Sequence, residues 1–300
     1  MNKHSRYVAL ALVGLLLVLV SQSAAAAPMA AAPWVDQEED KKAVVETAMN
    51  YMEGAYTASA ERMAKAVHSE LTKVQLSTFA QTGTYYLRPA GATRLIEVVR
   101  GMQVVPEEDR NIELKVLDIG NEMAVVMMDT SHFHDLLQLA KISGEWKIIN
   151  VLWIPNPESE GGQRNPPPVM AEDAAEEQAV TAAALDYIDG AYSGDAERMA
   201  RGVHPDLTKV RVVTHPKTGG VFLDNTSASL LVEGTRAQLM MLDEDARNIE
   251  VEIYDSRYGI STVKVVSAMY IDHLQLAKID DEWRIVNVLW AVNPEAPPRQ

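Results

Sequence analysis

An internal repeat constrains the fold of this chain more than any other feature of its sequence. The segment AERMAKAVHSELTKV at residues 60–74 returns as AERMARGVHPDLTKV at residues 196–210. Tyr51 and Tyr187 keep the same offset, and the copies close alike, with INVLWIPNPE in the first and VNVLWAVNPE in the second. Each copy has about 115 residues, which is too long for a solenoid repeat and long enough for a small domain. The repeat therefore predicts two domains of one fold.

Composition marks the boundary between the two domains. We expect the first domain over residues 36–157 and the second over residues 172–295. Residues 158–171 separate them and contain a Gly-Gly pair and three consecutive prolines. Glycine pairs and proline runs are typical of exposed linkers. We therefore interpret residues 158–171 as a linker.

Residues 1–27 have the composition of a secretory signal peptide. Lys3 and Arg6 precede the apolar run YVALALVGLLLVLV, and the alanine-rich segment SQSAAAAP follows it. A basic start, a short apolar run and small residues at A-x-A spacing are typical of a cleaved export signal. The alternative is an uncleaved anchor, but the run has 14 residues, whereas a membrane-spanning helix needs roughly 20. We expect a secreted mature chain, in a bacterial periplasm, without membrane attachment.

Charge and composition restrict the classes of partner. The formal net charge of −15 repels nucleic-acid phosphates and anionic lipid surfaces, so we expect no nucleic-acid partner. The chain has no cysteine, which excludes disulfides, thiolate metal sites and thiol nucleophiles. It also carries no Gly-rich phosphate loop and no nucleophile elbow. We therefore predict no cofactor.

Helical spacing comes first in each copy. Apolar residues recur at three- and four-residue intervals over residues 44–56, which places them on one side of a helix. Ser59 and Asp195 precede the AERM segments and are suitable N-caps for a second, short helix. A third helical piece is expected over residues 91–103 and again over residues 227–241.

Strand spacing follows the helices. Alternation over residues 112–116 and compact apolar runs over residues 124–128 and 136–142 are typical of strands. The last strand, EWKIINVLW, is apolar on both faces, so both faces need cover. Helices can cover one face and the second copy the other. Strict alternation predicts one face with Trp146, Ile148, Asn150 and Leu152, and another with Ile149, Val151 and Trp153.

An ordered set of sequence words carries a resemblance over nearly all of both copies. The words are Y-[MI]-[ED]-G-A-Y, A-E-R-M, V-H-[SP]-[ED]-L-T-K, D-x-L-Q-L-A-K-I and E-W-[KR]-I-[IV]-N-V-L. The set resembles the putative lumazine-binding family of the nuclear transport factor two-like superfamily. The resemblance implies an α+β fold of two tandem cone-shaped domains, each with N-terminal helices packed on a curved antiparallel sheet around a cavity. Members commonly pair sheet against sheet, which implies an internal pseudo-dimer in a monomeric chain.

Two tyrosines are the sharpest candidates for a role in that cavity. Tyr51 and Tyr187 each lie eight residues before the cap of the second helix. The superfamily includes ketosteroid isomerases, and this spacing resembles that of their oxyanion-hole tyrosine. The structural alternative is a tyrosine packed between helix and sheet with its hydroxyl bonded to a polar group.

The other groups that such an isomerase needs are missing. The resemblance implies a carboxylate base early in the strand after the second helix, where this sequence has Gln75 and Arg211. The position of the protonated acid falls near Gln138 and Gln275. Neither glutamine nor arginine can take these proton-transfer roles. The tyrosines are therefore weighed as ligand-binding groups, and no catalytic residue is assigned.

Further polar residues recur in both copies within apolar surroundings. A buried acid is costly unless it is paired, so a carboxylate inside a strand indicates either a backbone or lysine partner or a polar group at the cavity floor. Imidazoles after a short helix can bond to backbone instead of ligand. The ligand-binding candidates are Tyr51, Tyr56, His68, Asp135 and Asn150 in the first copy, with Tyr187, Tyr192, His204, Asp272 and Asn287 in the second.

Lysine, tryptophan and histidine residues give weaker signals. Lys73 and Lys209 either pair with a nearby acid or anchor an anionic ligand. Trp153 and its counterpart Trp290 are expected at the contact between the copies rather than at the cavity mouth. His132 and His134 share a strand face, but their counterparts in the second copy are Met269 and Ile271. A metal site needs three or four ligands, so no metal site is predicted.

Three function hypotheses follow. The first is an exported module that binds a small apolar or aromatic molecule in one or both cones, without catalysis. The second is an isomerase or dehydratase that uses Tyr51 or Tyr187. The third is a protein-interaction scaffold with filled cones. One architecture can host all three. We favour the binding module because the expected cavity lining is apolar.

Overall fold

The structure is a computed structural model that describes residues 37–157 and 174–297. The predicted signal peptide (1–27) and linker (158–171) lie outside the described residues. The described residues belong to one compact unit. No helix in the described ranges is long and apolar enough to cross a lipid bilayer.

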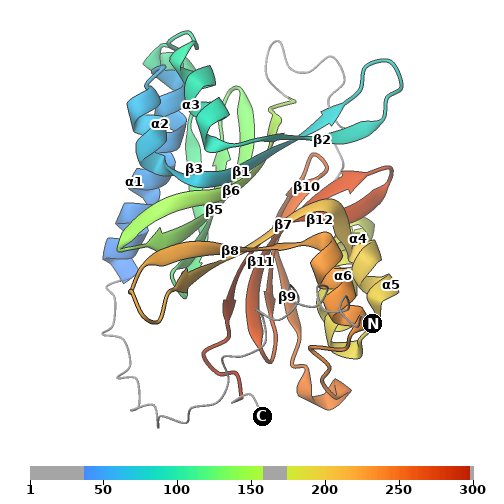
Figure 1. Ribbon diagram of the computed structural model, residues 1–300. Helices are drawn as coiled ribbons and strands as arrows, with labels where there is room; N and C mark the ends of the chain where they lie inside the picture. Colours follow the sequence, from blue (N-terminus) through green and yellow to red (C-terminus); the bar gives the residue numbers. More distant parts are fainter. Residues whose placement is uncertain (1–36, 158–173, 298–300) are drawn as a thin grey trace, which may run out of the picture. The chain divides into compact units, whose positions relative to one another are not determined.

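The two repeats contain the same elements in the same order (Figure 1). In the first repeat these are α1 Gln37–Tyr56, α2 Ala60–Ala66, β1 Val67–Thr78, β2 Tyr85–Ala90, α3 Ala92–Arg100, η1 Glu107–Asp109, β3 Glu113–Gly120, β4 Met123–Asp129, β5 Phe133–Ile142 and β6 Glu145–Pro155. In the second they are α4 Ala174–Ser193, α5 Ala196–Gly202, β7 Val203–Thr214, β8 Val221–Ser227, α6 Ala228–Arg236, η2 Glu244–Ala246, β9 Glu250–Arg257, β10 Ile260–Val266, β11 Tyr270–Ile279 and β12 Glu282–Val292.

The predicted N-caps of the second helix form in both repeats. The Ser59 hydroxyl accepts a hydrogen bond from the backbone N–H of Arg62 at 3.3 Å. Asp195 accepts from the backbone N–H groups of Glu197 and Arg198 at 3.0 Å each. A side-chain acceptor at this position satisfies N–H groups that the helix leaves unpaired. The caps fix where β1 and β7 begin, because each short helix runs directly into its strand.

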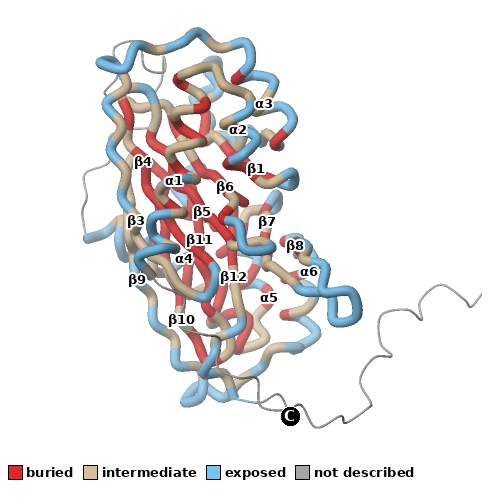
Figure 2. The backbone as a smooth tube through the Cα atoms, turned by 90° about the vertical axis from the view of Figure 1, so that its left-hand side faces the viewer, coloured by how far each residue is buried: buried red, intermediate tan, exposed pale blue. Residues whose placement is uncertain are grey.

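Each repeat has one six-stranded sheet, and the strand order in the first is β2-β1-β6-β5-β4-β3. The sheet is mixed, not wholly antiparallel as expected, because β1 and β6 pair in parallel, with Thr72 opposite Asn150. β12 and β7 pair in the same way in the second repeat. Three helices cover one face of each sheet, and the strands carry most of the buried residues (Figure 2).

A β-bulge corrects the expected faces of the last strand. Gln138 pairs with Asn150 but Leu139 pairs with Ile148, so Ile149 is an extra residue in β6. An extra residue reverses the alternation beyond it. Trp146, Ile148 and Val151 therefore share the cluster packed against the helices, whereas Leu152 packs on the opposite face of the sheet. Val151 and its counterpart Val288 are both fully buried.

Residues of both repeats share hydrophobic clusters on the faces turned away from the helices. One cluster contains Leu136, Leu152 and Ile154 of the first repeat with Ile260 and Val286 of the second. Two reciprocal hydrogen bonds accompany this packing. The side-chain amide of Gln138 donates to the His273 carbonyl at 2.8 Å, and that of Gln275 donates to the Leu136 carbonyl at 2.8 Å.

Candidate functional site

A buried lysine, tyrosine and aspartate meet beneath the helices of each repeat. The Tyr51 hydroxyl donates to Asp135 Oδ1 at 2.7 Å, and Lys73 Nζ donates to the same oxygen at 2.8 Å. Lys73 also donates to the Tyr51 hydroxyl. Only 10% of the Lys73 side chain and 1% of the Asp135 side chain are exposed. We call this arrangement the Lys-Tyr-Asp triad.

The second repeat contains the same triad. The Tyr187 hydroxyl and Lys209 Nζ both donate to Asp272 Oδ1, each at 2.7 Å. Lys209 also donates to the Tyr187 hydroxyl. Charge-assisted hydrogen bonds of this kind offset the cost of removing an ammonium and a carboxylate from water.

Three elements of each repeat position the triad. Tyr51 lies on the buried side of α1, Lys73 on the inner strand β1, and Asp135 near the start of β5. The predicted tyrosine and aspartate candidates are therefore neighbours, and the lysine has the acidic partner that was one of its two expected roles. The sequence contained a signal for the buried lysine. Lys73 lies between Leu71 and Val74 in a strand, and Lys209 has the same neighbours in the second repeat.

Burial changes the ionisation of the triad. It lowers the pKa of Lys73, although Asp135 opposes the change. It raises the pKa of Tyr51 well above the usual value near 10, and the Asp135 charge adds to the increase. Lys209 and Tyr187 change in the same directions. The tyrosine hydroxyls therefore stay protonated and donate to the carboxylate.

A tryptophan ring lies against each triad lysine. Lys73 Nζ is 4.3 Å from the centroid of the Trp153 ring, and Lys209 Nζ is 4.5 Å from that of Trp290. The expectation that these tryptophans lie between the copies is wrong, because the bulge at Ile149 turns Trp153 toward the helix side of the sheet. An ammonium over an indole face gains a cation–π attraction, and the ring gives the site a flat apolar wall.

The second repeat contains an apolar cavity of about 310 Å³ above its triad. The triad residues Lys209 on β7 and Tyr187 on α4 line it, and α6 contributes Leu230, Leu231 and Gly234. The remaining lining residues are Ile188, Ala191, Met199, Thr226, Leu239, Met240, Tyr270 and Trp290. This volume and character suit a small ligand.

The first repeat contains a smaller pocket of about 250 Å³ at the corresponding end of its sheet. Its lining is more basic, with Lys73 on β1, Arg88 on β2 and Arg94 on α3. Gln75, Ala90, Leu95, Val98 and Trp153 complete it. The two repeats therefore offer cavities of different chemistry.

The second tyrosine of each repeat is buried but lines neither cavity. The Tyr192 hydroxyl lies 2.9 Å from Ser267 Oγ and accepts from the backbone N–H of Met269 at 3.2 Å. The Tyr56 hydroxyl is 3.4 Å from His132 Nδ1. These tyrosines hold the loop before β5 or β11 against the helix.

The histidine candidates lie at the start of β1 and β7. His68 Nδ1 accepts from the backbone N–H of Glu70 at 3.2 Å, and His204 Nδ1 accepts from that of Asp206 at 3.1 Å. Burial lowers the pKa of both imidazoles. Neither histidine lines a cavity described above, and each satisfies a backbone donor of its own chain.

The asparagine candidates lie on the sheet face opposite to the helices. Asn150 Nδ2 donates to Gln138 Oε1 at 2.9 Å, and Asn287 Nδ2 donates to Gln275 Oε1 at 2.8 Å. Each asparagine thus orients the glutamine that bonds to the other repeat. The structure does not bring them near the triads, because the bulge in β6 and β12 separates their face from that of the tryptophans.

The histidines weighed for metal binding have other partners. His134 Nδ1 lies 2.6 Å from Asp129 Oδ1, and its Nε2 lies 3.3 Å from Asp255 Oδ2 of the second repeat. His132 Nδ1 lies 2.9 Å from Ser131 Oγ. Within the part of the chain that the structure describes, no group of three His, Cys, Asp or Glu residues has metal-binding geometry.

Several solved structures are similar to part of this chain. An NTF2-like protein of unknown function from Shewanella baltica is 20% identical; the match covers 41% of this chain and 99% of that chain, with a TM-score of 0.34. One from Silicibacter pomeroyi is 17% identical over 40% of this chain and 98% of that chain, with a TM-score of 0.34. A ketosteroid isomerase-like protein from Erwinia carotovora is 14% identical. That match covers 40% of this chain and 98% of that chain, with a TM-score of 0.30.

A family comparison covers both repeats. No curated protein matches the chain. The family model described as "Putative lumazine-binding" matches residues 39–154 and again residues 175–291. The two matches together span more than half of the chain and coincide with the two sets of helices and strands. The chain belongs to the Putative lumazine-binding family and carries two copies of its domain in tandem.

Proposed function

We propose that this protein binds a small, largely apolar or aromatic molecule in the cavity of its second repeat, without catalysing a reaction. The observation that carries the proposal is the 310 Å³ cavity, which has the size of a small-molecule site. Its lining is apolar except for a few groups gathered at the triad. A pocket with an apolar wall and few convergent polar groups is typical of binding sites.

The polar groups at the floor favour a ligand with one hydrogen-bond acceptor. Lys209 uses two of its three N–H donors on Asp272 and Tyr187. Among the described residues, the buried indole N–H of Trp290 has no hydrogen-bond partner. A carbonyl or ether oxygen on an otherwise apolar molecule would satisfy such donors, while Leu230 and Leu231 contact its body.

The isomerase alternative has weaker support. Its tyrosine would donate to a developing oxyanion, but the Tyr187 hydroxyl already donates to Asp272. The position of the general base holds Arg211, which instead bonds to Asp224. Lys209 Nζ also donates to Asp272 Oδ1, so the same carboxylate oxygen already accepts two hydrogen bonds. Binding therefore fits these contacts better than proton transfer.

We further propose export to the periplasm and an intramolecular pseudo-dimer. Export rests on the basic, apolar and alanine-rich order of residues 1–27. The reciprocal bonds of Gln138 and Gln275 support the pseudo-dimer, because two-fold related partners exchange equivalent contacts. Each repeat would then cover the apolar sheet face of the other.

Native mass spectrometry of the protein purified from its own periplasm tests the function. We expect an added mass on the wild-type chain, and loss of that mass in Gly234→Leu, which fills the cavity. Val98→Leu changes the corresponding residue of the first repeat and is the matched control. An added mass retained by Gly234→Leu would contradict binding in this cavity.

A further inference from the structure

The pocket of the first repeat has an excess of positive charge. Three of its lining side chains are cationic, namely Lys73, Arg88 and Arg94, and none is acidic. Lys73 is neutralised by Asp135, which leaves the two arginines. A cavity with one sign of charge attracts small ions of the opposite sign. This charge is unusual in a chain whose formal net charge is −15.

Arg88 and Arg94 differ from the other described arginines because they form no salt bridge. The described residues include twelve arginines, and ten of them form salt bridges with Asp or Glu. Arg88 and Arg94 are the two that do not, and both line the same pocket. In the described ranges, Arg94 makes one long hydrogen bond, 3.4 Å to the Pro89 carbonyl. Their guanidinium donors are therefore available.

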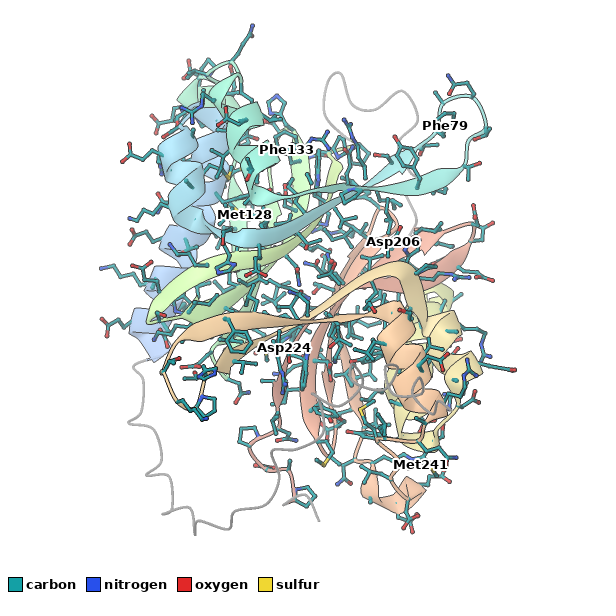
Figure 3. All side chains as sticks on the ribbon, viewed as in Figure 1. Phe79, Met128, Phe133, Asp206, Asp224 and Met241 are labelled. Atoms are coloured by element: carbon teal, nitrogen blue, oxygen red, sulfur yellow. The ribbon has the colours of Figure 1, made fainter. Side chains whose placement is uncertain are left out.

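The second repeat shows that the fold does not require this charge. The cross-strand pair Gln75–Arg88 of the first repeat is replaced by Arg211–Asp224 in the second. There the two side chains neutralise each other, with Arg211 Nη2 2.8 Å from Asp224 Oδ2; Asp224 lies on β8 (Figure 3). Leu230 occupies the position of Arg94. The same backbone thus carries two free arginines in one repeat and none in the other.

The start of α3 adds to the positive field. Its N-cap is Gly91, which supplies no side-chain acceptor, and its first turn has no acidic residue. In the second repeat, Ser227 caps α6 by accepting from the backbone N–H of Leu230 at 3.3 Å. An uncapped helix start presents free N–H groups and the positive end of the helix dipole. Arg94 lies in this turn.

We infer that the first-repeat pocket is a separate site for a small organic carboxylate with a flat, unsaturated or aromatic body. Arginine binds carboxylate through two parallel N–H···O bonds, so Arg88 and Arg94 supply the recognition of charge. Trp153 supplies a flat surface for the body, and Leu95 and Val98 supply apolar contact. The site differs from the second-repeat cavity in position and in ligand charge, and does not depend on that cavity being occupied.

The test uses 2-naphthoate as the probe and its neutral isostere 2-naphthamide as the chemical control. Isothermal titration of the full mature chain should show one naphthoate site in the wild type and at least tenfold weaker binding of the amide. Arg94→Leu introduces the residue type that the second repeat has at this position, and Arg88→Gln introduces a shorter, neutral side chain. Each variant should bind naphthoate at least tenfold more weakly. Both positions are exposed, so the variants should fold as the wild type does.

Two matched variants complete the design. Arg100→Leu removes an exposed arginine of the same helix that pairs with Glu97 and should leave naphthoate binding unchanged. Gly234→Leu fills the cavity of the second repeat and should also leave naphthoate binding unchanged. This variant therefore distinguishes the first-repeat site from the ligand site proposed for the second repeat. Equal affinity for acid and amide, or wild-type affinity in both Arg88→Gln and Arg94→Leu, would overturn the inference. Loss of naphthoate binding in Gly234→Leu alone would overturn it too.

Discussion

Arg211 and Asp224 form a salt bridge across β7 and β8, with 2.8 Å between Nη2 and Oδ2. In the first repeat the same register brings Gln75 opposite Arg88, and that arginine makes no ion pair in the described ranges. The two repeats thus share strand pairing and the buried triad but differ in the charge beside it. The cavities of the two repeats are therefore chemically distinct.

The buried triad predicts a large effect of removing its lysine. Lys209→Met leaves Asp272 buried without a counter-charge, and we expect the free energy of unfolding to fall by about 3–5 kcal/mol. Urea denaturation followed by tryptophan fluorescence measures the change. Lys65→Met, which removes an exposed pairing with Glu46, should cost no more than about 1 kcal/mol. Equal losses in the two variants would show that the triad lysine is not a paired buried charge.

The glutamine bonds predict that the repeats depend on each other. Gln275→Ala leaves the Leu136 carbonyl and the Asn287 amide without their partner. An unsatisfied buried polar group costs about 1–3 kcal/mol, so the midpoint of urea unfolding should fall. Gln81→Ala, in the exposed turn between β1 and β2, is the control and should be neutral. A neutral Gln275→Ala would contradict a stabilising contact between the repeats.

His273 predicts a loss of stability at acid pH. Burial lowers its pKa from 6.5 to about 4, with Asp118 opposing and Lys264 adding to the change. The folded state therefore binds this proton less readily than the unfolded chain, and the free energy of unfolding should fall as pH decreases from about 6.5 toward 4. His273→Leu introduces the residue found at the corresponding position, Leu136. In the variant, the free energy of unfolding should fall less steeply over this pH range. An unchanged dependence on pH would contradict the role given to His273.

His134 predicts the opposite dependence. Although burial opposes protonation, the carboxylates of Asp129 and Asp255, which face the two ring nitrogens, leave its pKa raised. The stability that this histidine contributes is present below its unfolded pKa near 6.5 and is lost as the pH rises through the higher folded value. His134→Ile, which introduces the residue of the second repeat at that position, should lose stability mainly at low pH. A uniform loss at all pH values would show that packing, not charge, is the cause.

Much of the fold was predictable from the sequence because it depends on local spacing and on the repeat. Helical periodicity, the caps Ser59 and Asp195, and the strand runs were all confirmed. The parallel pairing of β1 with β6 and the bulge at Ile149 were not. Both depend on which strands meet in three dimensions. A single extra residue also leaves no signature in a strand that is apolar on both faces. The misplaced tryptophans followed from that bulge.

The site was predictable only in part. Tyr51 was named as a candidate from its spacing to the cap of the second helix, and Asp135 because an acid in apolar surroundings needs a partner. The structure joins them by a direct hydrogen bond and through Lys73. That residues of α1, β1 and β5 meet in one triad could be seen only in the tertiary structure. The contrast between Arg88 and Asp224 was visible in the aligned repeats, but its meaning required the pocket beside it.

Binding of the neutral aromatic probe N-phenyl-1-naphthylamine to cavity variants tests the central claim most directly. Gly234 is a helical position of α6 at the cavity wall, where an added Cβ would lie 3.7 Å from Leu239 Cδ1. Gly234→Leu therefore fills the cavity while improving helix propensity, and Val98→Leu is its first-repeat control. A fluorescence titration should show one probe site in the wild type and in Val98→Leu, with affinity reduced at least tenfold in Gly234→Leu. Equal affinity in all three proteins would contradict an apolar ligand site in the second repeat.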